Sequence, residues 1–64
     1  MIKINGEELN VAGRTVAQFL AERGYDVKRV AVELNGDILP KTQYECTVLQ
    51  GEDSVEIVSF VGGG

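Results

Sequence analysis

A single segment of the chain has helical periodicity, and the stretches on both sides of it alternate polar and apolar residues. From Thr15 onward, Val16, Phe19 and Leu20 fall on one helical face. Thr15 and Gln18 fit a capping box at the helix start, and Gly24 can end the helix in a left-handed conformation. A helix of about two and a half turns is marginal in isolation. We therefore expect this helix to be held by packing against a sheet.

The alternating stretches predict the strands of that sheet. Residues 1–11 read as an N-terminal β-hairpin, because the Asn5-Gly6 pair favours a tight turn with positive φ. A second Asn-Gly pair, Asn35-Gly36, separates a third strand from a short edge strand that Pro40 stops. The third strand is expected over 30–34 and the edge strand at 38–39. An irregular or single-turn helical connection should follow over 41–45, then a short strand over 46–49 and a last strand over 54–61.

The order strand, strand, helix and then strands predicts an α+β fold, in which one helix crosses a mixed sheet of four to five strands. This order is typical of the ubiquitin-like β-grasp arrangement. A chain of 64 residues has room for one domain, which we take as residues 1–64. We expect residues 62–64, the run Gly-Gly-Gly, to form a flexible C-terminal tail.

The composition disfavours several classes of function. The chain has no histidine and one cysteine, Cys46, so an internal disulfide and a multi-cysteine metal site are excluded and independent catalysis is disfavoured. The net charge of -4 disfavours nucleic acid as a partner. No apolar run approaches the roughly 20 residues that span a bilayer, and the N-terminus does not resemble a signal peptide. We therefore expect a cytoplasmic protein without a membrane partner.

The terminal glycines are the main candidate for a functional element. Gly62, Gly63 and Gly64 have no side chains to pack, so stability does not explain them. They are either a frayed terminus or a tail that threads a narrow channel and delivers the Gly64 carboxylate to another protein's active site. A carboxylate must be activated before it reacts, and adenylation by ATP followed by sulfur transfer would give a thiocarboxylate. The chain has no phosphate-binding loop, so we expect it to bind no cofactor and a separate enzyme to use the ATP.

The last predicted strand carries apolar residues on both faces. Val55 and Ile57 alternate with Val58 and Phe60. The second set is either covered by loops of this chain or forms an apolar surface, together with Val61, on which a partner docks beside the tail. Sequence alone leaves both interpretations open.

Two other features receive structural interpretations. Cys46 could carry sulfur as a persulfide, but no histidine is available to activate it, so we expect a buried small apolar residue there. Glu52, Asp53 and Glu56 are either a solvated face, which we favour, or a patch that pairs with a basic partner.

The chain opens with Ile-Lys-Ile-Asn-Gly at residues 2–6 and ends with Glu-Ile-Val-Ser-Phe-Val-Gly-Gly-Gly at residues 56–64. With these two segments and its length, the chain resembles the ThiS family, the sulfur carrier proteins of thiamin biosynthesis. The resemblance covers the whole chain and implies a carrier, not an enzyme. Gly63 and Gly64 match the glycine pair of the family, whereas Gly62 is an extra glycine.

The resemblance also implies a reaction sequence and a set of partners. The Gly64 carboxylate would be adenylated by a ThiF-like enzyme, receive sulfur from a donor protein and pass it to a ThiG-like thiazole synthase. We expect the free protein to be a monomer. Alternatives remain open: a related carrier for molybdopterin, cysteine synthesis or tRNA thiolation, a ubiquitin-like modifier or interaction module, and, least favoured, an independent enzyme. The length favours the thiamin branch among the carriers.

Overall fold

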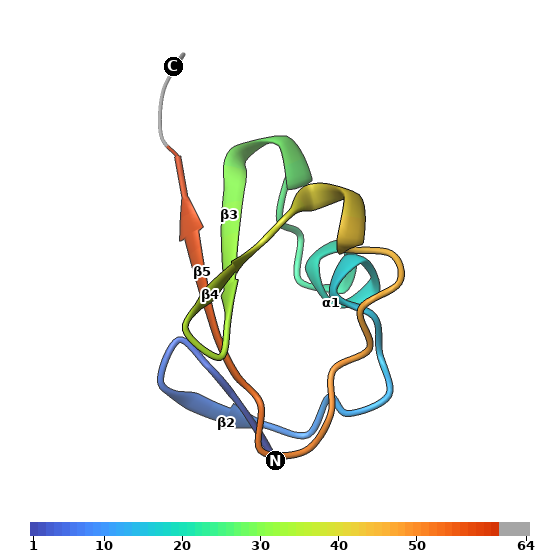
Figure 1. Cartoon of the computed structure of the whole chain (residues 1–64), viewed down its shortest axis with the longest axis vertical. Helices are drawn as coiled ribbons and strands as arrows, with labels where there is room; N and C mark the ends of the chain where they lie inside the picture. Colours follow the sequence, from blue (N-terminus) through green and yellow to red (C-terminus); the bar gives the residue numbers. More distant parts are fainter. Residues whose placement is uncertain (61–64) are drawn as a thin grey trace.

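The computed structural model of the chain describes residues 1–60 and shows a sheet with an α-helix lying across one of its faces (Figure 1). The strands are β1 (Ile2–Ile4), β2 (Glu7–Leu9), β3 (Val30–Leu34), β4 (Asp37–Leu39) and β5 (Ser54–Ser59). The helix is α1 (Val16–Glu22), and the 3-10 turns are η1 (Val27–Arg29) and η2 (Lys41–Gln43).

The five strands follow the order β2-β1-β5-β3-β4, which makes β5 the central strand. The strands β1 and β5 run parallel, and every other neighbouring pair is antiparallel. The expected α+β architecture, a mixed sheet with one helix across it, is confirmed. The last strand of the chain therefore lies at the centre of the sheet and not at its edge.

Both expected Asn-Gly hairpins are present. They join β1 to β2 and β3 to β4. Asn5 and Asn35 have φ values of 51° and 53°, and the glycines that follow them also have positive φ. Asparagine tolerates the left-handed region better than most residues, and glycine adopts it freely, so each pair supplies both central residues of a tight turn.

The predicted caps of α1 are confirmed. The Gln18 backbone N–H donates to the Thr15 side chain at 3.0 Å, and the Thr15 N–H donates to the Gln18 side chain at 2.9 Å. At the other end Gly24 has a φ of 79°. The Gly24 N–H donates to the Ala21 carbonyl and the Tyr25 N–H to the Leu20 carbonyl, which together form a Schellman motif.

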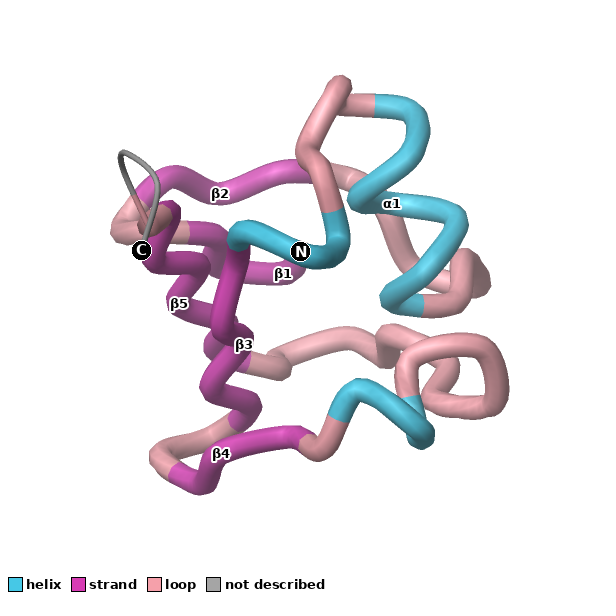
Figure 2. Tube along the Cα trace, turned by 90° about the horizontal axis from the view of Figure 1, so that it is seen from above, coloured by secondary structure: helices cyan, strands magenta, loops and turns pink. Residues whose placement is uncertain are grey.

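The core lies between the sheet and α1, on the side that also carries the connections after β4 (Figure 2). The apolar face of the helix, Val16, Phe19 and Leu20, is buried as expected. The other buried residues are Ile2, Ile4, Val11, Val30, Val32, Tyr44, Leu49, Val55 and Ile57. Among residues 1–60, no helix is long and apolar enough to cross a membrane.

The expected strand over 46–49 is wrong. Val48 forms only an isolated bridge, with Thr15. The backbone of this segment bonds the loop that leads into α1: the Leu49 N–H donates to the Arg14 carbonyl at 2.8 Å, and the Gly13 N–H donates to the Leu49 carbonyl at 2.9 Å. The segment therefore lies beside the helix instead of joining the sheet. Of the four residues in this segment, only Leu49 is buried. A pattern of four residues was therefore too short to identify a strand.

The structure also differs from the sequence-based predictions at Cys46 and at the end of the last strand. Cys46 is exposed, so the expected burial of its side chain is wrong. Its thiol lies 3.5 Å from the Gln43 carbonyl oxygen, at the turn that follows η2. The expected last strand over 54–61 ends at Ser59, and Val61 lies outside the described residues. The expected single-turn helical connection is confirmed as η2.

Candidate functional site: the outer face of the sheet and the end of β5

The two faces of β5 differ in burial. Val55 and Ile57 are buried against α1, whereas Val58 and Phe60 are 52% and 55% exposed. The sequence left open whether loops of the chain cover Val58 and Phe60. In the described part of the chain these two side chains remain accessible, because the long connection between β4 and β5 runs on the helix side of the sheet (Figure 2). They are therefore available to a partner.

The surface of the sheet that faces away from α1, here called the outer face, mixes apolar and acidic side chains. The register places Ala31 opposite Val58 and Glu33 opposite Glu56. On its other side Glu33 faces Ile38, which is 75% exposed. Like charges directly opposite each other destabilise a sheet, so a cationic group bound between the two glutamates would relieve this repulsion. Among residues 1–60, the two salt bridges involve neither glutamate.

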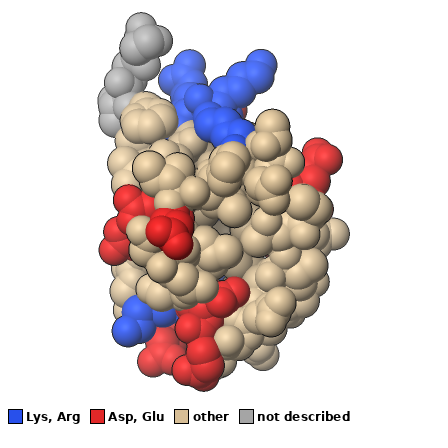
Figure 3. Space-filling model, viewed as in Figure 1, with Lys and Arg blue, Asp and Glu red and all other residues tan. Residues whose placement is uncertain are grey.

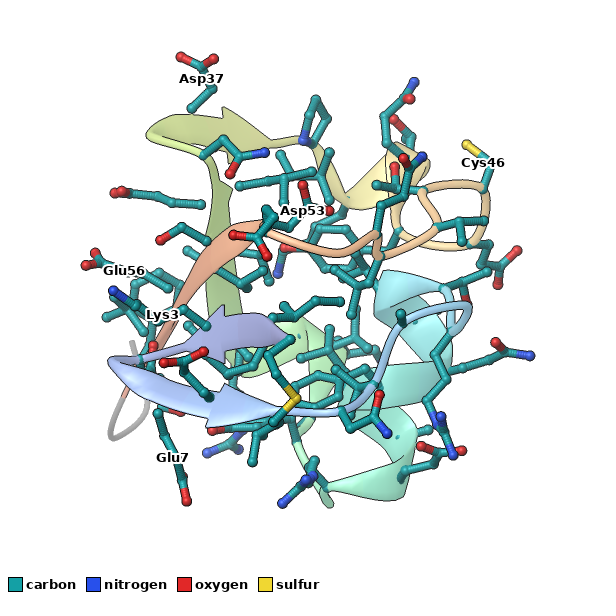
Figure 4. The ribbon with its side chains drawn as sticks, turned by 90° about the horizontal axis from the view of Figure 1, so that it is seen from below. Lys3, Glu7, Asp37, Cys46, Asp53 and Glu56 are labelled. Atoms are coloured by element: carbon teal, nitrogen blue, oxygen red, sulfur yellow. The ribbon has the colours of Figure 1, made fainter. Side chains whose placement is uncertain are left out.

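Lys3 is the basic side chain of β1 on this side of the sheet. Figure 4 shows Lys3 and Glu56 projecting on the same side, away from the helix. The register agrees with this placement, because Lys3 lies opposite Ser54. Ser54 is an even-numbered residue of β5, as are Glu56 and Val58 on the outer face. The outer face thus carries a cation at its β1 side and the glutamate pair between β5 and β3.

Hydrogen bonds hold the end of β5 from both sides. Toward β3, the Phe60 N–H donates to the Arg29 carbonyl at 2.7 Å, one residue beyond the strand. Toward β1, the Ile57 N–H donates to Asn5 Oδ1 at 2.7 Å, and Asn5 Nδ2 donates to the Ile57 carbonyl at 3.2 Å. The path of the chain is therefore fixed up to Phe60, four residues before Gly64.

Basic side chains gather at the end of the molecule where β5 finishes (Figure 3). Lys28 and Arg29 lie in η1, and the Arg29 carbonyl is the group that binds Phe60. Lys41 reaches the same place, where its Nζ donates to the Val27 carbonyl at 2.8 Å. The described end of β5 therefore lies beside positive charge, although the chain as a whole is acidic.

Several predicted site residues lie outside the described residues. These are Val61, expected to contact a partner, and Gly62, Gly63 and Gly64, expected to form the reactive tail. Their roles remain predictions. Asn5 contributes to the site although it is not among the predicted site residues, because the sequence presents it as part of a tight turn and of the opening at residues 2–6.

The other candidates separate into different parts of the fold. Asp53 is held internally, because its carboxylate accepts hydrogen bonds from Asn35 Nδ2 and the Gln50 N–H. Glu52 lies in a turn with a φ of 73°. Only Glu56 of this acidic group belongs to the outer face. Cys46 lies on the opposite side of the molecule from Glu56 (Figure 4).

No metal centre is present in the described part of the chain, where no group of three or more His, Cys, Asp or Glu residues could hold an ion.

The site consists of an exposed face of mixed apolar and acidic character and a strand end that is fixed on both sides. Such a site can bind another protein and present the residues that follow β5 to it.

Comparison with known proteins places the chain among small proteins of thiamin metabolism. The sulfur carrier protein ThiS of Thermus thermophilus is 34% identical over 64 residues, which is 100% of both chains. The crystal structure of a thiamine biosynthesis protein (ThiS) from Geobacter metallireducens has a TM-score of 0.79 and 31% identity, covering 98% of this chain and 97% of that one. The shared fold confirms the ubiquitin-like β-grasp arrangement.

A longer relative carries a similar segment. A protein named thiazole synthase from Paramagnetospirillum magneticum is 48% identical over 62 residues, and the match covers 95% of this chain. The chain spans only 19% of the length of that relative. The model of the ThiS family matches residues 2–64. With this match over nearly the whole sequence and relatives of equal extent, the chain belongs to the ThiS family.

Proposed function

We propose that this protein is a sulfur carrier of thiamin biosynthesis that holds sulfur as a thiocarboxylate on Gly64. The observation that supports this most directly is the fixed end of β5, where a strand held on both sides leads within four residues to the glycine pair that resembles the family's reactive terminus. The T. thermophilus relative of equal length bears the name of a sulfur carrier protein, which supports the same role.

The chemistry requires activation by a partner enzyme that uses ATP. A carboxylate oxygen of Gly64 attacks the α-phosphate of ATP and releases pyrophosphate. Hydrosulfide then attacks the acyl carbon of the adenylate, AMP leaves with the bonding electrons, and loss of the sulfur-bound proton gives the thiocarboxylate. A sulfur donor protein would supply this sulfur, together with a two-electron thiol reductant where the donor carries it as a persulfide. Glycines suit a segment that enters a narrow active site, because they bring no side chains. Four extended residues span at most about 14 Å, which sets how far Gly64 reaches beyond Phe60.

The proposal includes two enzymes that bind the carrier in turn. The first is a ThiF-like adenylating enzyme, and the second is a thiazole synthase that accepts the sulfur. The thiazole synthase of P. magneticum contains a segment similar to this chain, and covalent linkage of two proteins is one way to raise their effective concentration for each other. We propose that Val58 and Phe60, with Val61, contact these partners and that the reactions take place in the cytoplasm.

Deletion of Gly64 tests the proposal. With a purified ThiF-type adenylating enzyme, the intact protein should support ATP–pyrophosphate exchange. The truncated protein should lose at least about 100-fold of that rate, because its carboxylate ends one residue short of the reacting position. Its melting temperature should stay unchanged, since the buried core lies within residues 2–57. Undiminished exchange by the truncated protein would refute the assignment of Gly64.

A further inference from the structure

The side chain of Asn5 takes the place of a missing strand neighbour of β5. The last backbone hydrogen bond between β1 and β5 is the one that the Asn5 N–H donates to the Val55 carbonyl at 2.8 Å. The backbone then turns away at Asn5, whose φ is 51°. Asn5 Oδ1 nevertheless accepts from the Ile57 N–H at 2.7 Å, and Nδ2 donates to the Ile57 carbonyl at 3.2 Å. The side-chain amide therefore continues the ladder as one more peptide group would.

This contact is the last point at which the β1 side of the sheet holds β5. The bonds from Phe60 to Arg29 and from Asn35 to Ser54 show that the even-numbered residues of β5 turn their backbone groups toward β3. Ile57 and Ser59 consequently turn theirs toward β1, which ends at Ile4. Beyond Ile57, β5 runs past the end of its parallel neighbour. Without the Asn5 side-chain amide, the part of β5 beyond Val55 would be bound from the β3 side alone.

We propose that Asn5 is a positioning residue for the chemistry at Gly64. Its side chain fixes the place and direction in which β5 leaves the sheet, and hence where the terminal glycines arrive when a partner is bound to the outer face. This inference rests on the proposed function. The expected size of the effect is large for a residue that touches no reactant, because a misplacement of about 1 Å at a reacting atom can lower a rate by about 100-fold.

Asn35 provides a matched control within the same chain. It occupies the other Asn-Gly turn with a nearly equal φ of 53°. Its side chain also makes two hydrogen bonds, from the Ser54 N–H to Oδ1 at 2.9 Å and from Nδ2 to Asp53 Oδ1 at 3.1 Å. These bonds hold the start of β5 instead of its end. Glycine tolerates positive φ, so Asn5→Gly and Asn35→Gly each remove two side-chain hydrogen bonds without straining the turn.

The experiment compares both variants with the intact protein in ATP–pyrophosphate exchange by a purified ThiF-type adenylating enzyme, below the melting temperature of all three. We expect Asn5→Gly to lower kcat about tenfold while KM for the carrier changes less than about twofold, because the docking face is intact and the tail is misplaced. Asn35→Gly should leave kcat within about twofold of the intact protein. A kcat for Asn5→Gly within that limit, or an equal loss in Asn35→Gly, would overturn the positioning role.

A second measurement needs no partner. In amide hydrogen exchange of the free protein, Asn5→Gly should speed exchange at Ile57 and Phe60 about tenfold, and Asn35→Gly should do so at Ser54 but not at Phe60. Unchanged protection of both Ile57 and Phe60 in Asn5→Gly would overturn the proposal.

A further variant covers the case in which Asn5→Gly does not fold. Asn5→Asp keeps the acceptor for the Ile57 N–H but cannot donate to the Ile57 carbonyl, so its kcat should fall about threefold, and a normal kcat would overturn the positioning role. The failure of the proposed function is recognised separately, because then the intact protein would support no exchange at all. That result would contradict the carrier chemistry and the role of Asn5 together.

Discussion

At the scale of single residues, Phe60 combines an exposed ring with a fixed backbone. The ring is 55% exposed, while the N–H donates to the Arg29 carbonyl at 2.7 Å. An aromatic side chain held in this way is presented to a partner at little entropic cost, because the main chain is already ordered before binding. Aromatic residues of this kind often account for a large share of the binding energy at protein interfaces.

We predict that Phe60→Ala weakens binding to the adenylating enzyme at least about tenfold. The free energy of unfolding should fall by less than about 1 kcal/mol, since the ring contributes little to the core. Val48→Ala is the control, because Val48 is 44% exposed but lies beside the helix, away from the outer face. Titration calorimetry and chemical denaturation measure the two quantities. A large loss of stability with unchanged binding would show that the Phe60 ring is part of the core.

At the scale of elements, α1 depends on its ends because it has only seven residues. Gly24 closes its C-terminus with a φ of 79°, and a Cβ added there would meet no atom within 4 Å. Any penalty for a larger residue must therefore come from the backbone conformation. Gly51 is also free of neighbours within 4 Å, but its φ lies outside the positive range.

These two glycines give a paired prediction. Gly24→Ala should lower the free energy of unfolding by about 1–2 kcal/mol, because alanine disfavours the left-handed conformation. Gly51→Ala should be neutral or stabilise by up to about 1 kcal/mol, because it restricts the unfolded chain without straining the folded one. Denaturant titration of both variants measures the difference. Equal effects at the two positions would contradict the role of Gly24 as a cap.

The sequence predicted those elements whose stabilising contacts are local. The two Asn-Gly turns and the capping box of Thr15 and Gln18 depend on residues within a few positions of each other, so their pattern is visible in the sequence. The segment 46–49 depends on contacts with residues 13–16, more than thirty positions away. Such contacts leave no local pattern, which is why a strand was expected there.

At the scale of the whole molecule, the arrangement of strands determines which residues form the site. Alternation and the turn residues together predicted the five strands seen here, but they do not specify that β1 lies beside β5. This neighbour relation brings Asn5 to Ile57, 52 positions along the chain. The path of the connection between β4 and β5 is equally non-local, and it decides that Val58 and Phe60 stay exposed. The candidate face was therefore predicted as one of two alternatives.

Mass spectrometry of the C-terminal peptide can detect the proposed conversion of Gly64 to a thiocarboxylate. The protein is incubated with a ThiF-type adenylating enzyme, ATP and sulfide, then cleaved after Glu56. The peptide of residues 57–64 contains neither Met1 nor Cys46, so oxidation of those residues cannot imitate the replacement of oxygen by sulfur. We predict the mass of this replacement on the peptide, and its loss when ATP is omitted. An unmodified peptide, or Gly64 joined to a lysine, would contradict the assignment of Gly64 as the sulfur-carrying residue.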